Sequence, residues 1–180
     1  MNSVIVAVAS YAVFLVPLAA AVVWLQVPRT QKLALAGVGV LTIVLAAVGI
    51  ELAALVWTDP RPFVVDGHTP LLPHAADNGF PSDHTTFAAA IAAALFPWRR
   101  RLAAGLLVVA AVVGAARVAA HVHHVPDIIG GFLIGVAAAA VATVAVRALL
   151  RNRGGLGVKA QRPADPAWAD RTAAHPHAGG

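Results

Sequence analysis

The sequence of 180 residues contains no cysteine. This absence excludes disulfides, zinc sites built on thiolates and cysteine nucleophiles. Charged residues are also scarce, at 12% of the chain, against about 25% in ordinary soluble domains. Hydrophobic residues make up 59%, and the mean hydropathy is +0.79. The composition therefore excludes a soluble globular domain, and it excludes disorder for most of the chain.

Long apolar stretches predict an all-α, integral-membrane helical bundle of about five to six transmembrane helices. The first stretch has no basic residues before it and is longer than the apolar core of a signal peptide, so we expect it to be retained. The third is short, and the arginines that follow it could extend to the membrane surface. The five predicted spans are Val4–Val27, Leu33–Trp57, Thr85–Trp98, Leu102–Ala120 and Ile128–Leu150.

The placement of charge predicts an orientation in the cell membrane. With five spans, every Lys and Arg except Arg61 and Arg117 falls on one side. The positive-inside rule puts that side in the cytoplasm, together with the C-terminus, and puts the N-terminus outside. The net charge of +5 is thereby explained without a nucleic-acid partner. Residues 1–150 are predicted to form the membrane domain, and residues 151–180, rich in Gly, Pro, Ala and charge, a disordered cytoplasmic tail.

Three polar segments fall on the predicted outer side. The connection Thr58–Asp83 is long, and long loops are often functional. Ser82 is a candidate N-cap for the next helix, where free backbone N–H groups attract anions. In the segment Ala116–Asp127, His123 and Asp127 are four residues apart and could share one face of a helical turn.

In isolation, each of these residues has a simpler interpretation. A single Arg or Asp at a helix end is usually an interfacial anchor. The group His121, His123 and His124 could instead bind a metal, because imidazole suits zinc, copper and nickel. The convergence of three polar segments on one side favours a functional site, since charge at membrane depth is costly.

The residue types at this side suit phosphoryl transfer. The guanidinium groups of Arg61 and Arg117 match phosphate geometry. Of His84 and His123, one could attack as a neutral imidazole while the other donates a proton to the leaving oxygen. Asp127 could fix the tautomer of the attacking ring. This chemistry proceeds through a phosphohistidine and needs no metal or other cofactor.

Three motifs occur in order along the chain: Arg61-Pro62, then Pro81-Ser82-Asp83-His84, then Arg117 followed by His123 and Asp127. They resemble, in residues and spacing, the three signatures of type 2 phosphatidic acid phosphatases (PAP2), membrane relatives of the vanadium haloperoxidases. The stretch from Leu72 to Thr86 is similar to the undecaprenyl-diphosphatase branch linked to bacitracin resistance. The resemblance implies a PAP2/haloperoxidase-like core, with His123 as the nucleophile, Asp127 as its orienting partner and His84 as the general acid. It assigns phosphate binding to Arg61, Arg117, Ser82 and Asp83.

The sequence departs from the family pattern at Ala54, where the first signature often has Lys. One phosphate-binding cation is therefore missing. The remaining candidates to replace its charge, if protonated, are the other histidines of the outer side: His68, His74, His121 and His124.

The leading hypothesis is a membrane phosphatase that converts undecaprenyl diphosphate to undecaprenyl phosphate, a lipid carrier used in cell-wall synthesis. The same chemistry would serve another lipid phosphate, such as phosphatidate or phosphatidylglycerol phosphate. Membership of a different class, a metal-binding or transport protein built on the histidine cluster, predicts bound metal and activity lost to a chelator. A degenerate phosphatase that binds lipid phosphate without turnover is a fourth possibility, suggested by Ala54.

Overall fold

The computed structural model describes residues 1–160, with side chains as far as Asn152. Residues Met1–Arg147 form one compact unit, and a second unit begins at Ala148. The described part of the chain contains helices and one isolated bridge, Pro60 to Asn78, but no β-strand. The predicted all-α class is therefore confirmed. The predicted tail lies, for residues 161–180, outside the described residues.

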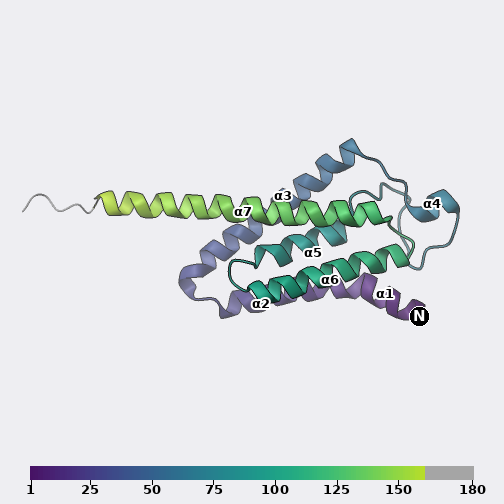
Figure 1. Cartoon of the computed structure of the whole chain (residues 1–180), viewed down its shortest axis with the longest axis horizontal. Coiled ribbons are helices and arrows are strands. Elements are labelled where there is room, and N and C mark those ends of the chain that lie inside the picture. Colours follow the sequence, from purple (N-terminus) through teal and green to yellow (C-terminus); the bar gives the residue numbers. More distant parts are fainter. Residues whose placement is uncertain (161–180) are drawn as a thin grey trace, which may run out of the picture. The chain divides into compact units, whose positions relative to one another are not determined.

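The elements follow the apolar stretches and their proline and glycine boundaries (Figure 1). In chain order they are α1 (Asn2–Tyr11), the 3-10 turn η1 (Ala12–Phe14), α2 (Leu15–Gln26), α3 (Arg29–Val56), α4 (Pro62–Asp66), α5 (Asp83–Ala94), α6 (Arg100–Ala119) and α7 (Val125–Ala160).

The first apolar stretch is interrupted by a proline. Pro17 lies in the first turn of α2, and its ring crowds the carbonyl of the residue four positions earlier, Val13. Val13 is the middle residue of the 3-10 turn η1, so the break between α1 and α2 is placed where Pro17 requires it. Pro28 then stands at the N-cap of α3 with an extended ψ of 151°, which separates α2 from α3.

Four helical segments in the described part of the chain are long and apolar enough to cross a membrane: Asn2–Gln26, Arg29–Val56, Arg100–Ala119 and Val125–Asn152. The third predicted span, Thr85–Trp98, is different. Its helix, α5, has 12 residues and ends at Ala94, so it is about 18 Å long. That length is too short for a hydrocarbon core of about 30 Å.

Helix α5 nevertheless carries the chain along the bundle in the direction opposite to α6 (Figure 1), so it counts as a crossing although it is an internal helix. It contacts α2, α3 and α6, and seven of its residues are buried: Thr85, Thr86, Ala88, Ala89, Ala90, Ala92 and Ala94. The alanine-rich sequence explains this position, because small side chains let neighbouring backbones approach closely.

Helix α7 packs against α5 through two glycines one turn apart. A Cβ added to Gly131 would stand 2.7 Å from the carbonyl oxygen of Ser82, and one added to Gly135 would stand 2.8 Å from the backbone nitrogen of Ala90. Both distances are shorter than real Cβ contacts allow. The GxxxG spacing thus marks a direct backbone-to-backbone contact between the two helices.

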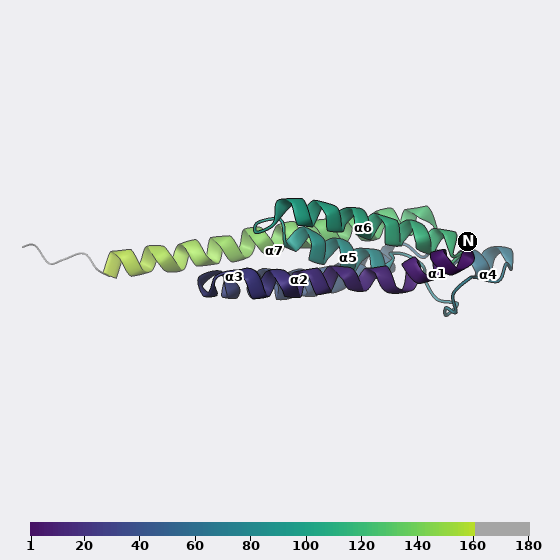
Figure 2. The same ribbon diagram turned by 90° about the horizontal axis from the view of Figure 1, so that it is seen from below.

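The first unit has two chemically different ends. The turns that join α2 to α3 and α5 to α6 lie at one end, and the start of α1, the short helix α4 and the link between α6 and α7 lie at the other (Figures 1 and 2). The first end carries exposed basic residues, among them Arg29, Arg100 and Arg101. Large apolar side chains face outward between the ends, for example Leu33 and Leu55, each 83% exposed. This distribution fits a multi-pass membrane protein.

We predict that Gly135→Ala lowers the melting temperature of the protein in detergent. The added methyl group would collide with the backbone of α5, and overpacking of this kind costs about 1–3 kcal/mol. Gly39→Ala is the matched control, because a Cβ there meets nothing within 4 Å, so its melting temperature should stay equal or rise. Equal melting temperatures for the wild type and Gly135→Ala would contradict the close contact between α5 and α7.

Candidate active site

The three polar segments of the sequence meet at the end of the unit opposite the exposed arginines. The backbone N–H of Leu71 donates to the carbonyl of Ala120 at 3.0 Å, and that of Ser82 donates to the carbonyl of Asp127 at 3.1 Å. The long connection, the start of α5 and the link between α6 and α7 are therefore joined by backbone hydrogen bonds. The convergence predicted from charge placement is present in the structure.

One side chain in the long connection holds its two ends together. The Asn78 Oδ1 accepts from the backbone N–H of Asp59 at 2.8 Å and of Phe80 at 3.1 Å, while its Nδ2 donates to the carbonyl of Trp57 at 3.2 Å. The next residue, Gly79, passes so close to the site that an added Cβ would stand 3.0 Å from Asp127 Oδ2. Sequence reasoning did not single out Asn78, because a lone Asn in a loop has no distinguishing pattern.

At the centre of the site lies the pair of His123 and Asp127. The ring Nδ1 of His123 donates to Asp127 Oδ2 at 3.1 Å, and the backbone N–H of His124 donates to the same oxygen at 2.9 Å. His123 is 3% exposed and Asp127 is fully buried. The carboxylate fixes the tautomer of His123 and leaves the lone pair of Nε2 available. Pro126 does not prevent this geometry, because α7 begins at Val125.

The pKa of His123 is lowered. Burial is the main cause, because it disfavours the charged ring. The hydrogen bond with Asp127 raises the pKa, but the positive charges of Arg117 and Arg61 lower it further. The ring is therefore neutral at neutral pH, as an attacking imidazole must be.

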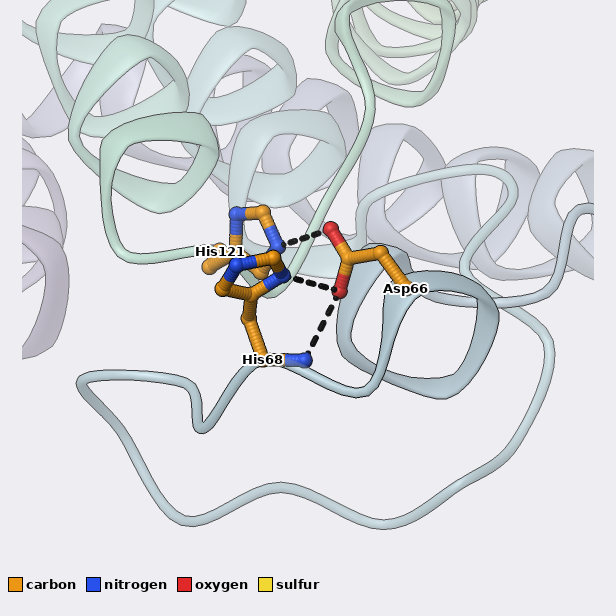
Figure 3. A group of neighbouring side chains, drawn as sticks. All are labelled: Asp66, His68 and His121. Atoms are coloured by element: carbon orange, nitrogen blue, oxygen red, sulfur yellow. Dashed lines mark hydrogen bonds and ion pairs between the residues drawn. The ribbon is translucent and has the colours of Figure 1, made fainter.

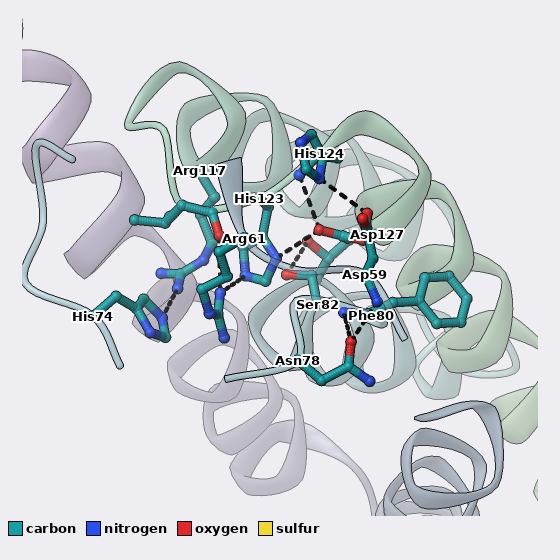
Figure 4. Close-up of polar contacts among 12 residues, drawn as sticks. Asp59, Arg61, His74, Asn78, Phe80, Ser82, Arg117, His123, His124 and Asp127 are labelled. Carbon is teal, nitrogen blue, oxygen red and sulfur yellow. Dashed lines mark hydrogen bonds and ion pairs between the residues drawn. The ribbon is translucent and has the colours of Figure 1, made fainter. Parts of the chain in front are cut away.

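Two buried guanidinium groups lie near His123 on the side toward His74 (Figure 4). The Arg61 Nη1 donates to the carbonyl of Val122 at 2.8 Å and lies 3.3 Å from His123 Nε2, while its Nε donates to Asp77 Oδ1 at 2.6 Å. Arg117 Nη2 donates to His74 Nε2 at 2.8 Å, and Arg117 Nη1 donates to the carbonyl of Ala9 at 3.4 Å. The buried Nε of Arg117 has no hydrogen-bond partner within the described residues. An anion bound here would supply one.

The second motif forms the start of α5. Ser82 occupies the N-cap position, as predicted, but makes no capping hydrogen bond through its side chain. Its buried hydroxyl instead accepts from Thr85 Oγ1 at 3.2 Å. Asp83 is exposed and His84, the next residue, is partly buried. The first backbone N–H groups of a helix lack intrahelical partners, so this end can donate to an anion.

His74 is a site residue that sequence reasoning named only as a candidate cation. Its ring lies edge-on to His123, with centroids 6.2 Å apart. The pKa of His74 is lowered to about 4, first by burial and then by the charges of Arg61 and Arg117. The ring is therefore a neutral acceptor for Arg117 at neutral pH. It does not replace the positive charge missing at Ala54, which lies partly buried near the end of α3.

The three neighbouring histidines of the third segment do not form one metal site. Each is hydrogen-bonded to a different carboxylate: His121 to Asp66 at 2.6 Å, His123 to Asp127 at 3.1 Å and His124 to Asp59 at 3.0 Å. Among the described residues, two groups that combine histidine and aspartate do have ligand atoms close enough together to hold an ion. These are Asp66 with His68 and His121, and Asp59 with His124 and Asp127.

Comparison with known proteins agrees with the motif geometry. The PAP2 superfamily matches residues 33–151. The chain belongs to this family. It is 31% identical over 138 residues to the undecaprenyl-diphosphatase BcrC of Bacillus subtilis (strain 168), covering 76% of this chain and 70% of the relative. It is 37% identical over 136 residues to YbjG of Escherichia coli (strain K12), a provisionally assigned undecaprenyl-diphosphatase, covering 75% and 68%. The resemblance to the undecaprenyl-diphosphatase branch is thus confirmed.

The fold has also been seen before. The crystal structure of Aquifex aeolicus LpxE superposes with a TM-score of 0.63 at 24% identity, over 78% of this chain and 84% of that one. At this level of identity the likeness establishes the PAP2-type helical fold.

We predict that a titration followed by NMR finds the His74 ring neutral down to about pH 4. Its folded pKa is lowered from 6.5 to about 4, so protonation on acidification occurs well below the usual range. Arg117→Gln removes one of the causes and should raise the pKa of His74. A midpoint near 6.5 in the wild type would show that His74 does not lie against the two arginines.

Proposed function

We propose that the chain is a membrane lipid phosphatase that hydrolyses undecaprenyl diphosphate to undecaprenyl phosphate and inorganic phosphate. The observation that carries the proposal is the neutral, carboxylate-oriented His123, which is buried against Arg61 and feels the charge of Arg117. The broader part, a lipid phosphatase, is supported by membership of the PAP2 superfamily and by the apolar exterior. The choice of undecaprenyl diphosphate is supported by the names of the two relatives.

In the first step, His123 Nε2 attacks the terminal phosphorus of the substrate. The nitrogen–phosphorus bond forms, and the bond from phosphorus to the bridging oxygen breaks. We assign proton donation to that oxygen to His84, which would release undecaprenyl phosphate. In the free protein, burial first and then the charge of Arg117 lower the pKa of His84 to about 4. The negative charge of the bound diphosphate must therefore raise this pKa before the ring can donate a proton. Asp127 accepts a hydrogen bond from His123 Nδ1–H and stabilises the positive charge that develops on the ring. Arg61 must turn its Nη1 from His123 Nε2 to the phosphate for the attack to occur.

In the second step, water attacks the phosphohistidine. His84, now neutral, takes a proton from the water, the nitrogen–phosphorus bond breaks, and inorganic phosphate leaves. The phosphoryl oxygens would be held by Arg61, Arg117, the hydroxyl of Ser82 and the backbone N–H of Asp83. These groups supply charge and directed donors where negative charge develops, so the proposed reaction has no step that needs a metal.

The orientation in the membrane belongs to the same proposal. We infer that the N-terminus and the site face the extracytoplasmic side and that the C-terminus is cytoplasmic. The support is the separation of the site from the exposed basic residues at the opposite end of the bundle. A substrate headgroup in the outer leaflet could then reach the site directly.

We predict that purified protein in detergent with excess EDTA releases phosphate from undecaprenyl diphosphate faster than from phosphatidate. His123→Ala should reduce this turnover by at least about 10³-fold, because it removes the nucleophile. Thr69→Ala, an exposed change on the same connection, is the matched control and should keep wild-type turnover. Faster release from phosphatidate would contradict the proposed substrate. Substantial turnover by folded His123→Ala would contradict the assignment of His123 as the nucleophile. Inactivation by EDTA would contradict a reaction that needs no metal.

We predict opposite labelling of two single-cysteine variants, Thr69→Cys near the site and Gln31→Cys at the basic end. Both positions are exposed, and the chain has no cysteine of its own. In intact spheroplasts a membrane-impermeant maleimide should label Thr69→Cys and should label Gln31→Cys only after permeabilisation. The reverse pattern, or labelling of both, would refute the proposed orientation.

A further inference from the structure

A group of metal-ligating side chains lies on the surface beside the site, outside the proposed reaction. It consists of Asp66, the last residue of α4, with His68 and His121 (Figure 3). Asp66 and His68 flank Gly67, whose left-handed conformation (φ 71°) turns the chain back on itself. His121 comes from the turn after α6. The group therefore joins two segments that are far apart in sequence.

The ligand atoms are close together and accessible. Asp66 Oδ2 accepts from His121 Nε2 at 2.6 Å, and Asp66 Oδ1 lies 3.3 Å from His68 Nδ1. One ligand atom from each residue lies within 4.8 Å of the other two. The His68 side chain is 77% exposed and the other two are 38% exposed, so an ion could enter and the side chains could adjust around it.

We propose that Asp66, His68 and His121 form a zinc site on the outer face of the protein. Two imidazoles and one carboxylate are a common ligand set for Zn²⁺, with water in the fourth position. His68 Nδ1, His121 Nε2 and one Asp66 oxygen bind the ion. The proton on His121 Nε2 moves to Nδ1 through exchange with water, which frees the Nε2 lone pair without a change of charge.

The ion joins the connection between α3 and α5 to the turn that precedes His123. Leu71 already makes a backbone hydrogen bond to Ala120 in the same region. His121 is two residues before His123, and the zinc link therefore restrains the segment that carries the proposed nucleophile. The expected consequence is greater thermal stability with zinc bound, independent of the phosphatase reaction.

The test is isothermal titration of the untagged full chain with Zn²⁺ in phosphate-free buffer, beside the melting temperature with and without zinc. The wild type should bind one ion and melt at a higher temperature with zinc. His121→Asn and His68→Asn should weaken binding by at least about ten-fold. Asn suits position 121 because His121 has a positive φ of 64°, which Asn tolerates.

His124→Asn is the matched control, since His124 belongs to the other group of possible ligands, with Asp59 and Asp127. It should bind zinc as the wild type does. No binding by the wild type would overturn the proposal. So would binding lost only in His124→Asn, or binding unchanged in all three variants. Each variant's melting temperature without zinc shows whether it is folded. Because no substrate is present, the result is independent of the proposed phosphatase activity.

Discussion

The buried carboxylate of Asp127 is the group on which the site depends. Its Oδ2 accepts from the ring of His123 and from the backbone of His124, and its carbonyl accepts from Ser82 at the start of α5. The side chain thus orients the proposed nucleophile, while the backbone of the same residue holds the start of α5, where we propose that phosphate binds. A buried carboxylate needs hydrogen bonds that compensate for lost hydration. Those bonds are the ones that assemble the site.

The sequence allowed the fold class to be predicted, and also the meeting of His123, Asp127 and the two arginines at one end of the bundle, for identifiable reasons. Apolar runs and basic flanks reveal helices in a membrane directly. His123 and Asp127 are four residues apart, which is about one helical turn, so their contact depends on local geometry that the sequence reveals. The length of α5 was harder to predict, because its apolar run continues through Leu95 to Trp98 although the helix ends at Ala94. A short helix buried inside a bundle and a helix that faces lipid have similar apolar compositions, so composition does not reveal where such a helix ends.

The contacts of the long connection could not be predicted. Asn78, Asp77 and His74 each make a hydrogen bond to a group 16 to 43 residues away along the chain. Loops have no periodicity from which such pairings could be inferred. The partial burial of His74 beside two arginines also decides its charge. Burial first, and then the charges of Arg61 and Arg117, lower the pKa of His74 and keep the ring neutral. The charge at the site therefore comes from two guanidinium groups, without a lysine at Ala54.

The contact between α5 and α7 links stability to chemistry. Gly131, where α7 meets the backbone of Ser82, lies one turn after Asp127. The interface that sets how tightly the two helices pack therefore also sets the rotation of α7 and the direction in which the Asp127 carboxylate points. A side chain added at Gly131 or Gly135 would therefore disturb the orientation of His123 as well as the packing of the two helices.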